Sequence, residues 1–297
     1  MSDPLRSWNE GETKTRILAS IAAMVDESSD EFVVPEKRVA TFDNDGTLWT
    51  EKPTYVQAAF LIAHWKDVAT RDPAKRKVEP YRAAYEDDVE WLGDLRAHLR
   101  ALERGIRESY VGISPEEYEL QVRRFFLDAR HPRFGHPFTE LGFEPMRELL
   151  DHLRANGFKV FVCTGGGRDF VRVVGEDMYG VEREQVIGSA PELEFIDGAM
   201  VRTGKLDGPL DDGPGKLVHI YARVGFPPAI AVGNSDGDIE MLASARFAIL
   251  LRHDDADREY AYDDGATEAR ELAAAQGWVV ASIRDDFARV FASDPTP

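Results

Sequence analysis

Two aspartates, Asp43 and Asp45, end a short apolar run in the segment VATFDNDGTLW, residues 39–49. Alternate residues of a strand point to the same side, so this pair directs two carboxylates into one small volume. Gly46 then allows a sharp turn and a close approach of the backbone to a ligand. Two carboxylates this close repel each other unless a metal ion, a basic group or a shared proton intervenes. The segment therefore indicates a catalytic or metal-binding site, although an ordinary Asp/Gly-rich turn has the same composition.

Later apolar runs also end in, or lie close to, polar residues. These are Thr164, Lys216 and the segment GNSDGD, residues 233–238. Thr164 is followed by three glycines and a segment with helical character, so backbone amides there could hold an anion. The glycine spacing is neither G-x-G-x-x-G nor a P-loop, which argues against a nucleotide-binding fingerprint.

The elements that must position these residues are apolar strands that alternate with amphipathic helices. Strands are expected over 39–42, 159–163, 229–232, 247–251 and 278–281. This alternation predicts an α/β fold, a doubly wound parallel sheet of Rossmann-like type. Such sheets bind ligands at the carboxyl ends of their strands, which is where the polar residues fall.

The ninety residues after the first strand have helical periodicity throughout. The sequence therefore predicts an α/β core domain over 1–50 and 140–297, with an inserted all-helical cap domain over 51–139. We expect the insert to act as a lid, and the alternative is a packed helical subdomain without a chemical role. Residues 185–212 contain Asp-Gly turns that predict one or two hairpins.

Composition narrows the class of protein. With 43% hydrophobic residues and no apolar run of bilayer length, we expect a soluble protein without a membrane span. The start of the chain has no signal-peptide pattern, and a single cysteine suits a reducing compartment, so a cytoplasmic location is expected. The net charge of −18 argues against nucleic acid and anionic membranes as partners. It also means that an anionic substrate would need a bound cation and a local lysine.

At this point the chain resembles the haloacid dehalogenase-like hydrolase superfamily, and within it the phosphoserine phosphatase-like phosphatases. Four signatures occur in the family's order: residues 43–48 (DNDGTL), Thr164, Lys216 and residues 233–238. The helical insert also matches one of the family's cap positions.

The resemblance implies a Mg²⁺-dependent phosphatase that acts on a small phosphorylated metabolite. Asp43 would be the nucleophile, and Asp45 the general acid and then the base. The Thr164 hydroxyl, the Gly165 amide and Lys216 would bind phosphoryl oxygens. The ion would bind Asp43, the carbonyl of Asp45 and an oxygen of the fourth signature. Dehalogenases of the superfamily lack the second aspartate, so Asp45 favours phosphate over halide.

Position 234 departs from the family pattern, which usually has aspartate there. We predict that Asn234 is a neutral metal ligand and that Asp238 binds the ion or its waters; Asp236, a less favoured substitute, could instead cap the next helix, expected over 239–244. Lys205 is the rival of Lys216 for the catalytic lysine.

Two substrate-binding candidates complete the predicted site. Glu51 lies near the position at which phosphoserine phosphatases carry an acid for the substrate ammonium, although the offset differs. Arg168 is a candidate for phosphate, with an ordinary surface arginine as the alternative. The acidic run 253–257 (HDDAD) is expected to be a solvated loop without a catalytic role.

Two other functions stay open from the sequence. Phosphoryl transfer to an acceptor other than water, as in a phosphotransferase or mutase, would use the same residues. A catalytically impaired ligand-binding protein is favoured only by Asn234. The sequence does not indicate an oligomeric state.

Overall fold

The computed structural model describes residues 3–294 and divides into two compact units. Unit 1 comprises Met1–Lys52, Phe138–Ser189 and Gly208–Pro297, and unit 2 comprises Pro53–Pro137 and Ala190–Asp207. Unit 2 therefore contains the inserted segment expected from the sequence and, in addition, a second segment that the sequence-based boundaries placed in the core.

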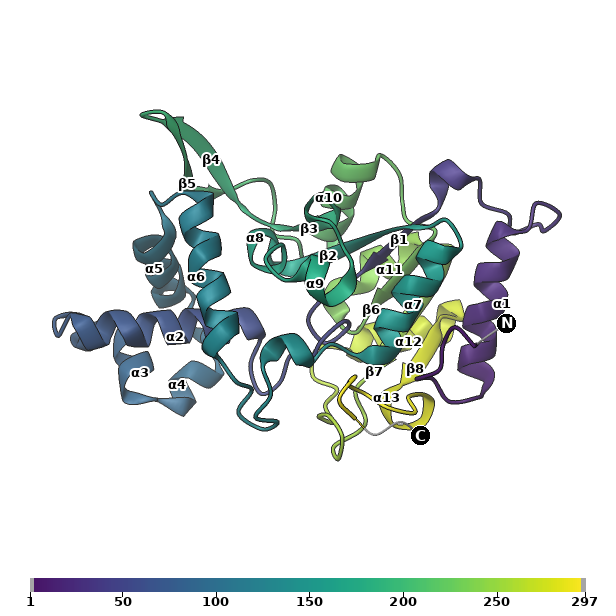
Figure 1. Cartoon of the computed structure of the whole chain (residues 1–297), viewed down its shortest axis with the longest axis horizontal. Coiled ribbons are helices and arrows are strands. Elements are labelled where there is room, and N and C mark those ends of the chain that lie inside the picture. Colours follow the sequence, from purple (N-terminus) through teal and green to yellow (C-terminus); the bar gives the residue numbers. More distant parts are fainter. Residues whose placement is uncertain (1–2, 295–297) are drawn as a thin grey trace. The chain divides into compact units, whose positions relative to one another are not determined.

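Unit 1 is built on a six-stranded, fully parallel sheet in the order β3-β2-β1-β6-β7-β8 (Figure 1). The central strand β1 places Phe42 opposite Val162 of β2 and opposite Val232 of β6. Parallel sheets are covered on both faces, which explains why these strands are continuously apolar. The strands are β1 (Val39–Phe42), β2 (Lys159–Gly167), β3 (Val186–Ser189), β6 (Ile230–Gly233), β7 (Phe247–Arg252) and β8 (Val279–Ser282).

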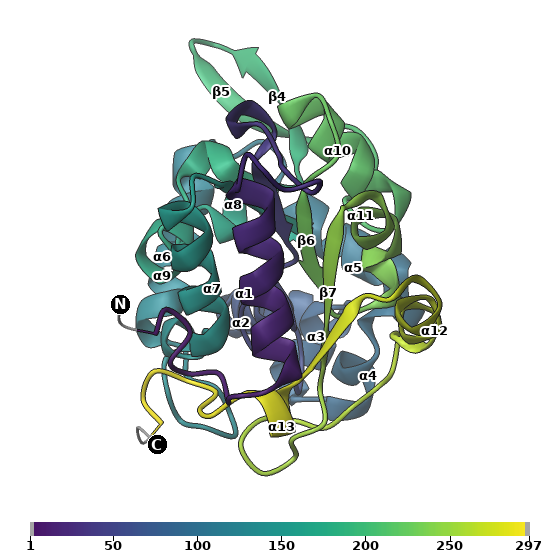
Figure 2. The same cartoon turned by 90° about the vertical axis from the view of Figure 1, so that its right-hand side faces the viewer.

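Helices cover both faces of this sheet, as the doubly wound prediction requires. Figure 2 shows α7 and α11 on opposite sides of β6 and β7. One face packs side chains of α10, α11 and α12, including Ile220, Met241 and Ala273, against the strands. The helices of unit 1 are α1 (Glu12–Val25), α7 (Glu144–Ala155), α8 (Arg168–Val171), α9 (Gly175–Tyr179), α10 (Pro214–Val224), α11 (Ile239–Ser244), α12 (Thr267–Gln276) and α13 (Ile283–Asp286). Within residues 3–294, no helix has the length and apolar character needed to cross a bilayer.

Strand β2 differs from the sequence-based expectation. It continues through the three glycines to Gly167, which pairs with Ser189 of β3 after a shift in register beyond Thr164. The helix expected next is split into the short α8 and α9. The glycines therefore form an irregular strand end rather than the start of a long helix, because β3 supplies pairing partners beyond Thr164.

Unit 2 has a helical, aromatic core. Phe60 of α2 stacks on Tyr110 with ring centroids 5.7 Å apart and meets Tyr118 edge to face. Helix α6 begins with a capping box in which Ser114 and Glu117 exchange side-chain to backbone hydrogen bonds. The helices are α2 (Val56–Arg71), α3 (Tyr81–Glu86), α4 (Val89–Gly93), α5 (Leu99–Tyr110) and α6 (Pro115–Asp128).

A β-hairpin belongs to the same unit although it follows β3 in the chain. Strands β4 (Pro191–Ile196) and β5 (Ala199–Leu206) meet at Asp197-Gly198, where both residues have positive φ. Arg202 of β5 exchanges backbone hydrogen bonds with the segment before α6, at 2.8 Å from the Gly112 nitrogen and 2.9 Å to the Ile113 oxygen. Its guanidinium lies 3.9 Å from the centre of the Tyr118 ring. These contacts explain why the hairpin groups with the helices.

Candidate active site

Lys216 joins three of the segments that the sequence singled out. Its ammonium lies 2.5 Å from Asp43 Oδ1 and 2.7 Å from Asp238 Oδ1, and it donates to the Cys163 carbonyl at 2.9 Å. Asp43 follows β1, Cys163 precedes Thr164 in β2, and Asp238 follows β6. One buried cation thus connects the carboxyl ends of three neighbouring strands. The rival, Lys205, is exposed in the hairpin of unit 2, 3.9 Å from Glu192.

The start of α10 is built to bring Lys216 this close. The Gly213 nitrogen donates to the Gly237 carbonyl at 2.9 Å, and Pro214 occupies the first turn, where its missing N–H is tolerated. A Cβ at Gly215 would lie 1.8 Å from the Leu210 carbonyl oxygen. Any larger residue would push the first turn of α10 outward and carry Lys216 with it.

The buried charges at this point are unbalanced. Burial raises the pKa of Asp43, the nearby Asp238 raises it further, and Lys216 opposes both. Burial also disfavours the charged form of Lys216, but Asp238 and Asp43 outweigh it and hold its pKa above its ordinary value. Lys216 is therefore a stable cation shared between two carboxyl groups. One positive charge does not balance two carboxylates, so a second cation at this site would be electrostatically favourable.

Asp45 lies two residues beyond the nucleophile candidate and is set up differently. Its Oδ1 accepts a hydrogen bond of 2.8 Å from the indole nitrogen of the buried Trp49. Burial raises the pKa of Asp45 to about 6, against the effect of the Trp49 hydrogen bond, and the charge of Glu51 adds to the rise. A carboxyl group that titrates close to neutral pH can both give and take a proton.

The Asn234 amide meets the oxygens that the sequence assigned to a metal ion. One terminal atom of this amide lies 3.1 Å from the Asp45 carbonyl oxygen, 3.1 Å from Thr47 Oγ1 and 3.3 Å from Asp43 Oδ2. As a nitrogen it donates to all three. In the opposite amide orientation, the Asn234 oxygen occupies this position beside the Asp43 and Asp45 oxygens. These oxygens would repel one another unless a cation lay between them.

This donor set fits Mg²⁺, which binds oxygen ligands and accepts an amide or backbone carbonyl among them. Across residues 3–294, no group of three or more His, Cys, Asp and Glu side chains is arranged to hold a metal ion. An ion at this site therefore depends on one carboxylate together with amide and backbone oxygens.

Asp238 is engaged on both sides of its carboxylate. Oδ1 faces Lys216, and Oδ2 accepts hydrogen bonds from the backbone nitrogens of Asn234 and Ser235 and from the Ser235 hydroxyl. This places Asp238 to hold Lys216 and the loop that carries Asn234; its predicted metal role stays a prediction. Asp236 accepts from the Ala269 nitrogen at 2.8 Å in the first turn of α12, so it does not cap α11, the helix that follows it in the chain.

The remaining predicted residues lie at different depths. Thr164 is fully buried, and its hydroxyl accepts from the Gly166 nitrogen at 3.1 Å. Gly165 is exposed, and its carbonyl accepts from the Ser189 hydroxyl. Arg168 is half-buried and lies 3.5 Å from Asp169. Thr164 and Gly165 therefore directly follow the Cys163 carbonyl that Lys216 contacts, whereas Arg168 is engaged with Asp169.

Glu51 is buried against the loop of Asp45. A Cβ at Gly46 would lie 2.9 Å from the Glu51 carboxyl carbon and 2.1 Å from the Asn234 amide. Gly46, at φ +72°, is the residue type that fits this gap. Burial raises the pKa of Glu51, while the neighbouring His253 lowers it.

The expectation of a solvated loop at 253–257 is wrong for two of its residues. His253 and Asp255 are buried, at 5% and 4% exposure. His253 reaches the Gly46 carbonyl, and Glu259, six residues later, is fully buried beside it. Sequence reasoning also missed Asp211, which accepts from the Cys163 thiol at 3.3 Å. Their signal was weak because such acidic segments are usually exposed.

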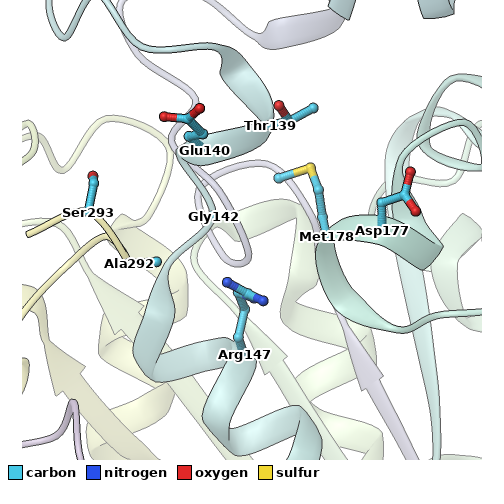
Figure 3. A pocket seen from close by; sticks show the side chains of 8 residues that line it. All are labelled: Thr139, Glu140, Gly142, Arg147, Asp177, Met178, Ala292 and Ser293. Atoms are coloured by element: carbon cyan, nitrogen blue, oxygen red, sulfur yellow. The ribbon is translucent and has the colours of Figure 1, made fainter.

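Two of the hollows among residues 3–294 lie in unit 1 and bear on where the chemistry takes place. One, of about 10 Å³, is lined in part by Asn234, His253 and Tyr262 and so adjoins the site. The other, of about 330 Å³, is shown in Figure 3, where Arg147 points into it between Glu140 and Asp177. None of the predicted site residues lines this larger hollow, so we assign the chemistry to the strand ends.

Asp45→Asn is expected to stabilise the metal-free protein at neutral pH. Because the folded pKa exceeds the unfolded value of 3.8, stability falls as pH rises from about 4 to 6. Above this window the buried carboxylate costs about 1–2 kcal/mol, allowing for its partial exposure, and asparagine removes that cost while keeping the Trp49 bond. Urea unfolding with a chelator should show this gain at pH 7.5 and none at pH 4. An equal gain at both pH values would contradict the assignment.

Comparisons with known proteins give the family and the fold. The model of the haloacid dehalogenase-like hydrolase family matches residues 40–243. Phosphoserine phosphatase SerB2 of Mycobacterium tuberculosis is 33% identical over 122 residues, which are 39% of this chain and 28% of that protein. The chain thus aligns with under a third of that relative's length.

Two solved structures of proteins with unknown function share the fold. The protein from Bordetella pertussis is 19% identical with a TM-score of 0.53, covering 82% of this chain and 98% of that one. The protein from Anaerococcus prevotii is 15% identical with a TM-score of 0.60, covering 95% and 94%. Because the family match spans more than half of the sequence and includes the Asp43, Lys216 and Asn234 segments, the chain belongs to the haloacid dehalogenase-like hydrolases.

Proposed function

We propose that this protein is a Mg²⁺-dependent phosphatase of small phosphomonoesters that works through an aspartyl-phosphate on Asp43. The observation that carries the proposal is the environment of that carboxylate. Lys216 contacts one oxygen at 2.5 Å and the Asn234 amide lies 3.3 Å from the other. Such a carboxylate is held in one orientation beside groups that would bind phosphate and a metal ion.

In the first half of the reaction, an oxygen of Asp43 attacks phosphorus in line with the ester oxygen. The P–O bond to the leaving group breaks as the P–O bond to Asp43 forms, and Asp45 gives its proton to the departing alkoxide. The pKa of about 6 keeps part of Asp45 protonated close to neutral pH. Lys216, the Thr164 hydroxyl and the Gly165 amide would stabilise charge on the phosphoryl oxygens.

In the second half, water attacks the same phosphorus atom. Asp45, now ionised, takes a proton from this water, the bond to Asp43 breaks, and phosphate leaves with both carboxyl groups restored. Asp43, the Asp45 carbonyl and Asn234 would hold Mg²⁺, which would supply positive charge to offset that of the phosphoryl group. Asp238 orients Lys216 throughout.

A small phosphomonoester that carries an ammonium group is the substrate class we favour. Glu51 is a buried carboxylate next to Gly46 and Asn234, so it adds negative charge close to the reacting centre. The similarity of part of the chain to a phosphoserine phosphatase supports the same class. A cytoplasmic location and the role of unit 2 as a lid stay predictions.

Asp43→Asn should lower phosphatase activity on an aryl phosphate by at least about a thousand-fold, because the amide cannot attack phosphorus. Asp151→Asn, at an exposed position of α7, is the matched control. Activity should also disappear with a chelator and return with Mg²⁺. Reaction in ¹⁸O-labelled water should place the label in free phosphate; label-free product transferred to another acceptor would favour a phosphotransferase. Turnover that survives Asp43→Asn would exclude this nucleophile.

Two substitutions at position 234 should move metal binding in opposite directions. Asn234→Ala removes an oxygen ligand and is expected to weaken Mg²⁺ binding about tenfold, or about 1.4 kcal/mol. Asn234→Asp places a carboxylate near Asp43, so it should lower the melting temperature without metal and tighten Mg²⁺ binding. Calorimetric titration with Mg²⁺ measures the affinity of both variants, thermal unfolding measures their melting temperatures, and Asn156→Ala serves as the control. Unchanged affinity in both variants would remove Asn234 from the metal site.

A panel of phosphorylated metabolites tests the substrate class. We expect phosphoserine and other ammonium-bearing monoesters to have higher kcat/KM than sugar phosphates. Glu51→Gln should narrow that difference by raising KM for the cationic substrates more than KM for the aryl phosphate. Equal turnover across the panel would count against a role of Glu51 in selection.

A further inference from the structure

A buried histidine–glutamate pair, His253 and Glu259, forms hydrogen bonds with the loop that follows Asp45. His253 Nε2 lies 2.7 Å from the Gly46 carbonyl oxygen, and Nδ1 lies 3.2 Å from Glu259 Oε2. Since a carbonyl only accepts, Nε2 carries a proton and donates to Gly46. Glu259 Oε1 accepts from the Thr50 hydroxyl at 2.5 Å. The pair therefore grips the loop at Gly46 and again at Thr50.

Gly46 is the position at which the loop most needs such a hold. The peptide before it carries the Asp45 carbonyl, which faces Asn234 at 3.1 Å, and the peptide after it carries the carbonyl bound by His253. Only the two dihedral angles of a glycine separate these peptide planes, and glycine is the most permissive residue. The hydrogen bond from His253 directs the Gly46 carbonyl toward the histidine and thereby helps to keep the Asp45 carbonyl directed toward Asn234.

The pair is itself immobilised. The His253 ring stacks on Tyr262 with centroids 4.3 Å apart, and Glu259 Oε2 also accepts from the Tyr260 nitrogen at 2.6 Å. Between the two grips the loop closes on itself, with the Gly46 nitrogen donating to the Trp49 carbonyl at 2.9 Å. His253, Glu259 and Thr50 are all at least 95% buried. Only side chains that are themselves held in place can fix the orientation of the loop. The contacts of His253 and Glu259 meet this condition.

We propose that His253 and Glu259 are positioning residues for the phosphatase site: they fix the Gly46–Thr50 turn so that the Asp45 carbonyl points to the metal position. They touch neither substrate nor ion. The inference deepens the proposed function, and it has a consequence that exists without substrate or metal, namely the rigidity of residues 44–50.

Hydrogen exchange of the full chain, without metal or substrate, tests the proposal. His253→Ala and Glu259→Ala should speed exchange of the Gly46, Leu48 and Trp49 amides at least tenfold. Ile17→Ala, a buried truncation in α1, serves as a control for loss of global stability. His253→Gln keeps a donor and should restore much of the protection, and Thr50→Val should loosen only the Thr50 end.

The kinetic part of the test separates this inference from the phosphatase assignment. In His253→Ala the Mg²⁺ concentration for half-maximal activity should rise about fivefold, with KM for substrate close to wild type. If His253→Ala does not fold, Glu259→Ala and Thr50→Val carry the test: exchange should speed up at Gly46, Leu48 and Trp49 in the first variant and only at the Thr50 end in the second. Exchange in 44–50 no faster than in Ile17→Ala overturns the proposal. Faster exchange in a protein without phosphatase activity supports the clamp and overturns only the proposed reaction.

Discussion

The ammonium of Lys216 is the contact on which the rest of the site depends. It is buried, lies within 2.9 Å of Asp43, Asp238 and the Cys163 carbonyl, and so connects the ends of β1, β2 and β6. A buried cation is costly unless its partners are well placed, and removing one partner leaves an uncompensated charge. The lysine therefore depends on three features together: Gly215, which allows the close approach of α10, and the carboxylates of Asp43 and Asp238. Their common effect is to fix the direction of the Asp43 carboxylate.

Burial of the carboxyl groups raises their pKa values, and it also lowers the stability of the folded protein when these groups are ionised. The pKa values of Asp43, Asp45 and Glu51 lie above their ordinary range, and loss of solvation is the main cause for each. The chain carries a net charge of −18, so its overall field does not favour an anionic substrate. Lys216, the loop amides and a divalent cation would have to reverse the local sign. In this account part of the folding free energy is given up to hold carboxylates where they can react.

The sequence predicted the parallel sheet and the positions of Asp43, Asp45, Lys216 and Asn234 because these depend on local patterns: apolar strands and polar residues at their ends. It did not predict features set by distant partners. His253 belongs to the acidic run 253–257 that was expected to be solvated, and Glu259 lies just beyond it; only the folded chain brings them to Gly46 and Thr50. The hairpin groups with the helices through Arg202 and Gly112, ninety residues apart. The strand through Gly165–Gly167 depends on pairing with Ser189.

The central claim is that Asp43 becomes covalently phosphorylated, and trapping that intermediate tests it most directly. The enzyme would be quenched during turnover of a phosphomonoester with Mg²⁺ and reduced with borohydride, which converts an acyl phosphate to an alcohol. Mass spectrometry of the peptide that contains residues 39–49 should then show homoserine at position 43 and unmodified Asp45. Modification at any other carboxylate, or none in an enzyme that is turning over, would contradict the account.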